Sequence, residues 1–119
     1  MTEIVWGNFT QEELDRNYDQ SSLVPNVGEL MEQNAADSSK IRENLEVVTD
    51  ISYGPTVMER LDFFPAAEKG GPVAIYHHGG AWTRSDKAQC SYVAPGLVEA
   101  GINVLVLDFA LARPVSLDE

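Results

Sequence analysis

The sequence predicts an α/β fold in which two helices precede an antiparallel hairpin and a parallel β-α-β unit. Three observations lead to this fold class. Apolar residues recur at helical period over 27–43, alternate with polar residues over much of 45–64, and form two short, nearly continuous runs at 72–78 and 103–109. The chain has 119 residues, of which 44% are hydrophobic, so it is large enough for one modest domain with a packed core.

Two helices are expected at the N-terminal end. Thr10 and Glu13 have the spacing of a capping box, in which each side chain satisfies a backbone donor, so a short helix is predicted over about 10–19. A longer amphipathic helix is predicted over 27–43 from apolar residues at helical spacing, namely Val27, Leu30, Met31 and Ala35.

An antiparallel hairpin is expected next. Strands are predicted at about 45–53 and 56–64, and Gly54-Pro55 supplies the turn between them. The period-two pattern of the first strand predicts that one of its faces is buried and the other exposed.

A β-α-β unit completes the predicted fold. The runs 72–78 and 103–109 have the continuous apolar character of strands that are covered on both faces. A helix is predicted between them over 86–100, with a kink or a break into two pieces at Pro95. A right-handed crossover would make the two strands parallel neighbours.

The composition excludes several classes of partner. There are 8 basic and 19 acidic residues, and the net charge of −11 opposes binding to nucleic acid or to anionic membranes. The single cysteine, Cys90, excludes an internal disulfide and a cysteine-based zinc site. The N-terminus lacks the pattern of a signal peptide and no apolar run approaches the length of a membrane span, so we expect a cytoplasmic protein. No cofactor is expected.

The most informative stretch is the loop His78-Gly79-Gly80-Ala81-Trp82, which follows a predicted strand and leads into a helix. Adjacent glycines leave backbone N–H groups uncovered, so they can approach a developing negative charge as in an oxyanion hole. A glycine turn that only reverses the chain is the structural alternative. The position between strand and helix favours the oxyanion interpretation.

The same loop, with the segments around it, resembles the arylformamidase (kynurenine formamidase)-like and esterase-lipase branch of the α/β-hydrolases. The resemblance implies an α/β-hydrolase fold, with residues 45–119 as the first half of its core and 1–44 as a helical segment packing on or capping that core. After Asp108 the family continues Tyr-Arg-Leu-Ala-Pro, whereas this chain has Phe-Ala-Leu-Ala-Arg-Pro. The matching segments are Tyr53-Gly54, Leu61-Asp62-Phe63, His78 to Trp82, Ser85-Asp86-Lys87, Gly101 to Val104 and Asp108-Phe109.

The resemblance also implies a reaction, in which a serine attacks a small amide or ester and the acyl-enzyme is then hydrolysed. Gly79, Gly80 and Ala81 would donate N–H groups to the oxyanion, and His78 would orient the loop. Trp82 would line the substrate pocket, with a core indole as the alternative. The N-terminal helices form either an outer layer or an aromatic wall of the pocket, to which Trp6, Phe9 and Tyr18 would contribute.

The nucleophile is expected outside these 119 residues, because no Gly-x-Ser-x-Gly elbow occurs in them. The catalytic acid and base would follow it, so the expected partner is the remaining C-terminal half, in the same polypeptide or a separate chain. Strand 72–78 would then form an open edge of the sheet. Association with further copies of the chain, and formamidase against esterase specificity, remain open.

Two other hypotheses compete with the enzyme. One is a hydrolase-like fold reused for binding, and the other is a structural subunit. A metal site is not expected, because consecutive strand residues such as His77 and His78 should point to opposite faces of the sheet.

Overall fold

The computed structural model describes residues 3–112 and 115–116. Its contacts divide the chain into two compact units, one extending to Met31 and the other beginning at Glu32. This division lies earlier than the expected boundary after residue 44, and it falls inside the long helix α2 (Val27–Asn44). The second part of α2 groups with the sheet because Ile41 packs against the hydrophobic core.

The N-terminal unit begins with a small antiparallel hairpin of β1 (Ile4–Trp6) and β2 (Phe9–Thr10), which the sequence analysis did not predict. Helix α1 (Gln11–Tyr18) follows, and its capping box is confirmed. The Glu13 N–H donates to the Thr10 hydroxyl, and the Glu13 carboxylate accepts from the Thr10 N–H at 2.9 Å. A short 3-10 helix, η1 (Gln20–Leu23), ends this run of elements.

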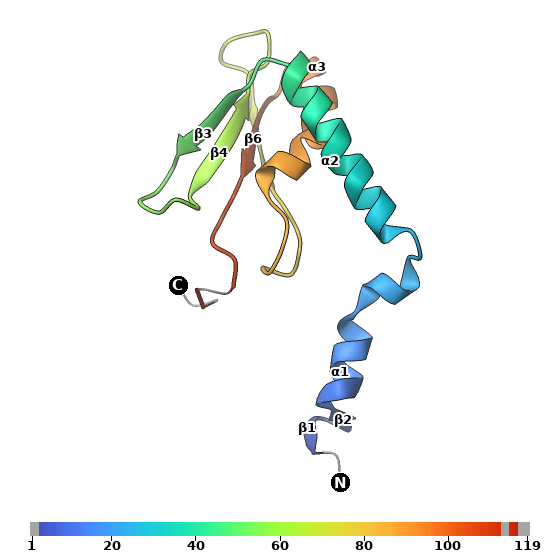
Figure 1. Ribbon diagram of the computed structural model, residues 1–119. Coiled ribbons are helices and arrows are strands. Elements are labelled where there is room, and N and C mark those ends of the chain that lie inside the picture. Colours follow the sequence, from blue (N-terminus) through green and yellow to red (C-terminus); the bar gives the residue numbers. More distant parts are fainter. Residues whose placement is uncertain (1–2, 113–114, 117–119) are drawn as a thin grey trace. The chain divides into compact units, whose positions relative to one another are not determined.

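A four-stranded sheet organises the second unit (Figure 1). Its strands are β3 (Val48–Ser52), β4 (Arg60–Phe64), β5 (Val73–His77) and β6 (Asn103–Leu107), in the order β3-β4-β6-β5. The predicted hairpin is confirmed by antiparallel β3 and β4, and the predicted parallel pair by β5 and β6. Within the described residues, β5 is an edge strand.

The core lies on one face of this sheet. Phe64, Val104 and Val106 are buried there with Cys90 and Ala94, which come from the segment between β5 and β6. Partly buried side chains complete the cluster, namely Ile41, Leu45, Val47, Tyr76, Val93, Leu97 and Val98. The C-terminal part of α2 and the helical segments between β5 and β6 therefore pack on this face of the sheet.

Two strands are less buried among the described residues than their sequence patterns indicated. Strand β3 is exposed throughout rather than half-buried. In addition, Asp50 has φ of 59° and the pairing with β4 shifts register between Val48 and Ile51. That irregularity breaks the alternation on which the prediction rested. Strand β5 is not covered on both faces by the described residues, since Val73 and Ile75 are 59% and 66% exposed.

The predicted helix over 86–100 is broken into two pieces, one of the two outcomes expected from Pro95. A 3-10 helix, η2 (Lys87–Val93), is capped by the carboxylate of Asp86, and helix α3 (Ala94–Glu99) follows it directly. Pro95 lies in the first turn of α3, where its missing N–H leaves no helical hydrogen bond unmade.

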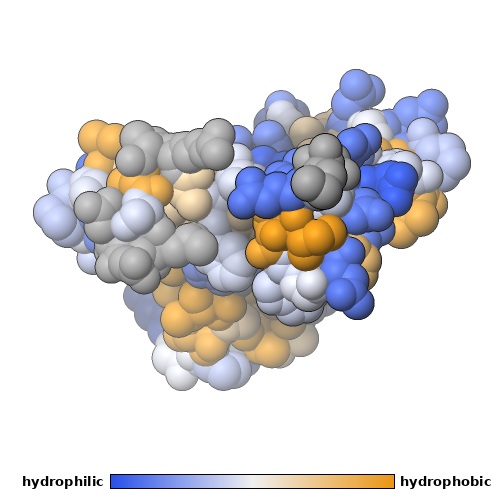
Figure 2. All heavy atoms as spheres, turned by 90° about the horizontal axis from the view of Figure 1, so that it is seen from below, coloured by the Kyte–Doolittle hydropathy of each residue, from blue (hydrophilic) through white to orange (hydrophobic). Residues whose placement is uncertain are grey.

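Hydrophobic side chains also reach the surface. Figure 2 shows several separate orange groups among hydrophilic residues on the face that it presents. In the second unit the exposed hydrophobic residues include Val57, Val73, Ile75 and Trp82. Among the described helices, none has the length and apolarity needed to cross a membrane.

Candidate active site

The carboxyl ends of β5 and β6 bring the informative loop next to a second segment. Because the two strands are parallel, the loop His78–Trp82 and the pair Asp108-Phe109 emerge at the same edge of the sheet. The turn between β3 and β4 reaches this edge as well, since the Asp108 N–H donates to the Arg60 carbonyl at 2.8 Å. Ligands of open α/β sheets bind outside the carboxyl ends of the strands.

The loop has an unusual backbone conformation. Gly80, Ala81 and Trp82 have φ of 119°, 51° and 56°, and a positive φ is costly for a residue with a side chain. At Gly80 a Cβ atom would lie 2.2 Å from the carbonyl oxygen of Arg84, so only glycine fits there. The turn is closed by the Thr83 N–H, which donates to the Gly80 carbonyl at 3.0 Å.

This conformation leaves three consecutive backbone donors free. Among the described residues, the N–H groups of Gly79, Gly80 and Ala81 donate no hydrogen bond. Gly79 and Ala81 are exposed and Gly80 is half-buried, so a ligand can reach this loop. Successive N–H groups in such a turn form a concavity that attracts anions.

His78 supports the loop from beneath. Its ring is 4% exposed, and Nδ1 lies 2.7 Å from the Gly79 carbonyl oxygen. Because a carbonyl oxygen only accepts, Nδ1 carries the proton of this hydrogen bond. The predicted loop-orienting residue therefore contacts the loop backbone directly.

The expectation that His77 and His78 diverge is wrong at this position. Both rings stack on Phe109, with centroid distances of 4.1 Å and 4.4 Å, and their own centroids are 6.2 Å apart. Strand β5 ends at His77, so the alternation of a strand does not extend to His78. In the described part of the chain, no group of three or more His, Cys, Asp or Glu residues could hold a metal ion.

Asp108, directly after β6, contacts the start of η2, the His78 ring and the β3–β4 hairpin. Its Oδ1 accepts from the Lys87 N–H at 2.6 Å and lies 3.9 Å from Nε2 of His78. Burial raises the pKa of the Asp108 carboxyl, and the Lys87 N–H opposes that rise by stabilising the carboxylate. The Tyr53 hydroxyl donates to the Asp108 carbonyl and thereby ties the β3–β4 hairpin to the same point.

An ion cluster around the buried side chains of Lys87 and Asp62 holds the beginning of η2 beside Asp108. The Lys87 ammonium lies 2.8 Å from Asp50 and 2.9 Å from Asp62, and Arg42 pairs with Asp62 as well. Burial lowers the pKa of Lys87, but the two carboxylates outweigh this effect and leave it raised. Asp62 is fully buried on the core side of β4, although an aspartate in an alternating strand would ordinarily face solvent.

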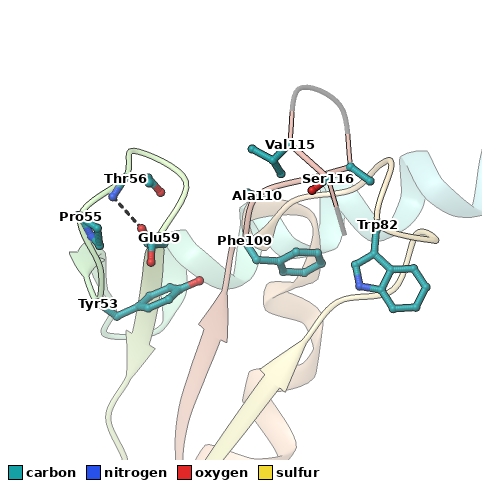
Figure 3. A pocket seen from close by; sticks show the side chains of 10 residues that line it. Tyr53, Pro55, Thr56, Glu59, Trp82, Phe109, Ala110, Val115 and Ser116 are labelled. Atoms are coloured by element: carbon teal, nitrogen blue, oxygen red, sulfur yellow. Dashed lines mark hydrogen bonds between the residues drawn. The ribbon is translucent and has the colours of Figure 1, made fainter. Parts of the chain in front are cut away.

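Two hollows adjoin at this edge and share Trp82 and Phe109. The smaller, of about 140 Å³, is lined by His77, His78, Gly79, Ala81, Trp82 and Phe109. The larger, of about 690 Å³, extends to the β3–β4 hairpin, as Figure 3 shows. Its lining consists of Tyr53, Pro55, Thr56, Glu59, Trp82, Phe109, Ala110, Ala112, Val115 and Ser116.

Of the predicted substrate-binding residues, Trp82 lines both hollows. It is 57% exposed among these 119 residues, and its role as a pocket wall or as a core indole stays a prediction. Tyr18 is 84% exposed and belongs to the N-terminal unit, as do Trp6 and Phe9. The role of Tyr18 in substrate binding, and that of the N-terminal segment as pocket wall or outer layer, stay predictions.

Three residues of this edge had no predicted site role. Both histidine rings stack on Phe109, the carboxylate of Asp108 accepts a hydrogen bond from the backbone N–H at the start of η2, and Glu59 lines the larger hollow. Position alone could have identified Asp108 and Phe109, because residues that follow neighbouring parallel strands meet at one edge. No local pattern marks Glu59.

A comparison with curated proteins finds a similar sequence. Kynurenine formamidase of Danio rerio is 24% identical over 121 residues, which cover 95% of this chain and 41% of the relative. No protein-family model matches the sequence. The chain thus spans about two fifths of the length of this relative.

Two solved structures have a fold similar to that of this chain. A protein of Silicibacter sp. TM1040, described as a candidate thioesterase, superposes with a TM-score of 0.79 at 26% identity, over 87% of this chain and 40% of that one. Esterase B of Lactobacillus rhamnosis, solved with a tributyrin phosphonate inhibitor, gives a TM-score of 0.55 at 19% identity, over 82% and 35%. The second likeness shows the fold alone.

Proposed function

We propose that this chain is part of a serine hydrolase. Its sequence is similar to an arylformamidase, and its fold is that of the first part of an α/β-hydrolase. The substrate is a small amide or ester, cleaved through an acyl-enzyme. The loop His78–Trp82 supplies N–H groups that stabilise the oxyanion.

One observation carries this proposal, namely the three free N–H groups of Gly79, Gly80 and Ala81 beside a hollow at the carboxyl ends of parallel strands. When a serine attacks the carbonyl carbon, negative charge develops on the carbonyl oxygen. Donors that are already oriented stabilise this charge without reorganising, and loss of one such donor costs about 2.7–4 kcal/mol of transition-state stabilisation in a protease.

The strained loop fits this role. Holding Ala81 and Trp82 at positive φ costs on the order of 1–3 kcal/mol per residue, so the surrounding contacts must maintain it. His78 provides one such contact through the Gly79 carbonyl, and the Ala112 N–H provides another by donating to the Trp82 carbonyl at 2.6 Å. Strain of this kind is common where a backbone is preorganised for a ligand.

The nucleophile, the acid and the base lie outside these 119 residues in this proposal, since the sequence contains no Gly-x-Ser-x-Gly elbow. The C-terminal half of the hydrolase, in the same polypeptide or a separate chain, would supply them. The second half of the oxyanion hole would come from the residue after the nucleophile.

Labelling with a fluorophosphonate tests the proposal. The protein that contains this chain should gain one covalent phosphonate on a serine, and heat-denatured protein should gain none. Absence of any adduct on the chain or on an associated polypeptide would contradict the proposal and favour a binding or structural role. Turnover of N-formylkynurenine against phenyl acetate then separates formamidase from esterase specificity.

A further inference from the structure

The larger hollow has a charge distribution that the oxyanion loop does not explain. Tyr53, Phe109 and Trp82 give it aromatic walls, and Figure 3 shows these rings on separate segments of the chain. Glu59, on the hairpin side, is the one charged residue among the described lining residues. A carboxylate beside aromatic rings is the chemistry with which proteins bind organic cations.

Glu59 is held in place as an anion. Its Oε2 accepts from the Thr56 N–H at 2.7 Å, which is drawn as a dashed line in Figure 3. This hydrogen bond lowers the pKa of the Glu59 carboxyl, so the group is ionised at neutral pH. Gly54 leaves room for it, because a Cβ atom there would lie 2.0 Å from Oε1 of Glu59.

The charge of Glu59 is not cancelled by an ion pair within the described residues. Arg60 is adjacent and its field contributes to the lowered pKa. Its guanidinium, however, donates through Nη1 to the Ser52 hydroxyl at 3.1 Å and to the Thr56 carbonyl at 2.8 Å. The carboxylate thus remains available to a cation in the hollow.

The two ends of this edge therefore differ in polarity. The loop presents free N–H groups, which favour an oxygen that becomes negative, and the hairpin presents a carboxylate. The smaller and larger hollows join these ends through their shared residues Trp82 and Phe109. A substrate with a reacting carbonyl at one end and a positive group at the other complements both.

Building on the proposed function, we propose that the site selects amides or esters whose aromatic portion carries an ammonium group, and that Glu59 determines this preference. The cation lies against the aromatic walls near Glu59, while the carbonyl oxygen faces the loop. Neutral substrates of the same shape bind less tightly, and anionic ones are repelled by Glu59.

A pair of isosteric ligands tests the preference without requiring turnover. The probes are 3-hydroxyphenyltrimethylammonium and 3-tert-butylphenol, which differ in charge but have nearly the same shape. Calorimetric titration of the whole protein should show that Glu59→Gln weakens binding of the cation about fivefold and of the neutral phenol less than about twofold. The cation's advantage should also shrink as salt is added.

The variant Glu99→Gln is the matched control, because Glu99 is an exposed carboxylate of α3 outside the hollow. It removes the same charge and should leave both affinities unchanged. Equal loss of cation binding in the Glu59 and Glu99 variants, or no loss in either, would overturn the inference. Glutamine keeps an oxygen for the Thr56 N–H, so the hairpin should remain folded.

Hydrolysis of the corresponding acetate esters separates this inference from the proposed function. A preference for the cationic ester that resides in KM and disappears in Glu59→Gln supports both. Hydrolysis of both esters without a preference overturns the inference alone. Cation binding that depends on Glu59, with neither hydrolysis nor a phosphonate adduct, overturns the proposed function alone.

Discussion

The ammonium of Lys87 lies 2.9 Å from the fully buried carboxylate of Asp62. This contact joins the beginning of η2 to the core side of β4, and the Lys87 N–H at the same point donates to Asp108. Asp108 in turn lies beside His78, which supports the loop with the free donors. The ion cluster therefore positions the start of η2 and, through Asp108 and His78, the loop of the candidate active site.

Replacement of Lys87 by methionine should destabilise the protein strongly. Asp62 would keep Arg42 as a partner but lose its second cation, so we expect a loss of about 3 kcal/mol in the free energy of unfolding, at the lower limit for breaking a buried ion pair. Urea unfolding measures it. The control Lys69→Met, at an exposed position, should change stability by less than about 0.5 kcal/mol. Similar values for the two variants would refute the structural role of the cluster.

Replacement by alanine should change the stability of the protein differently at two fully buried serines. The Ser38 hydroxyl donates to the Gln89 carbonyl at 2.9 Å and accepts from the Tyr92 N–H at 3.2 Å, so Ser38→Ala should cost about 1–3 kcal/mol. The Ser91 hydroxyl has no partner among the described residues, so Ser91→Ala should be neutral or stabilising. A larger loss at Ser91 than at Ser38 would contradict this account of the packing around η2.

The pair of Tyr76 and Tyr92 predicts an alkaline transition. Their hydroxyl oxygens are 3.3 Å apart, and this hydrogen bond together with burial raises the pKa of Tyr76 to about 12. A raised pKa means that the folded state holds the proton more firmly than the unfolded state. The resulting stability is complete below pH 10 and is lost as pH rises through about 12.

Titration of tyrosinate absorbance, with unfolding measured at the same pH values, checks this prediction. In Tyr76→Phe the component at about pH 12 should disappear, together with the loss of stability between pH 10 and 12. In Tyr92→Phe the pKa of Tyr76 should move back toward 10. An unchanged titration curve in both variants would rule out the assignment.

Gly80 should tolerate no side chain. In Gly80→Ala the Cβ atom would meet the Arg84 carbonyl at 2.2 Å, at a φ of 119° that alanine avoids, so the loop must rearrange. We expect a loss of about 1–3 kcal/mol in stability and a marked fall in kcat for ester hydrolysis. The control Gly96→Ala lies in helix α3, where the new Cβ would meet no atom within 4 Å outside its chain neighbours and the backbone of its own helix, so it should not be destabilised. Equal activity in the Gly80 variant and the wild type would show that the loop conformation is unimportant.

Local patterns predicted much of the fold. The capping box of Thr10 and Glu13 and the pairing of β3 with β4 and of β5 with β6 depend on neighbours in sequence or on continuous apolar runs. The β1–β2 hairpin was missed because its strands have only three and two residues, too few to establish a period.

The supporting contacts of the site could not be predicted in this way. Asp62 and Lys87 are charged residues of the kind that usually face solvent, and only the packing of η2 against β4 places them together. The bulge at Asp50, which turns its carboxylate to Lys87, interrupts β3 in the structure but cannot be recognised in the sequence pattern of residues 45–53. The loop itself was recognisable because two adjacent glycines leave backbone N–H groups uncovered, and this feature can be seen in the sequence alone.

The most direct test of the account replaces a single backbone N–H in the loop. Substitution of lactic acid for Ala81 converts that amide to an ester and removes the donor while the side chain stays the same. For aryl ester hydrolysis we expect kcat to fall roughly 10²–10³-fold with little change in KM. The same replacement at Ala88, an exposed residue outside the loop, should leave kcat unchanged. A kcat within about threefold of the wild type for the Ala81 ester, far smaller than the loss typical of such a donor, would contradict the claim that this loop stabilises an oxyanion.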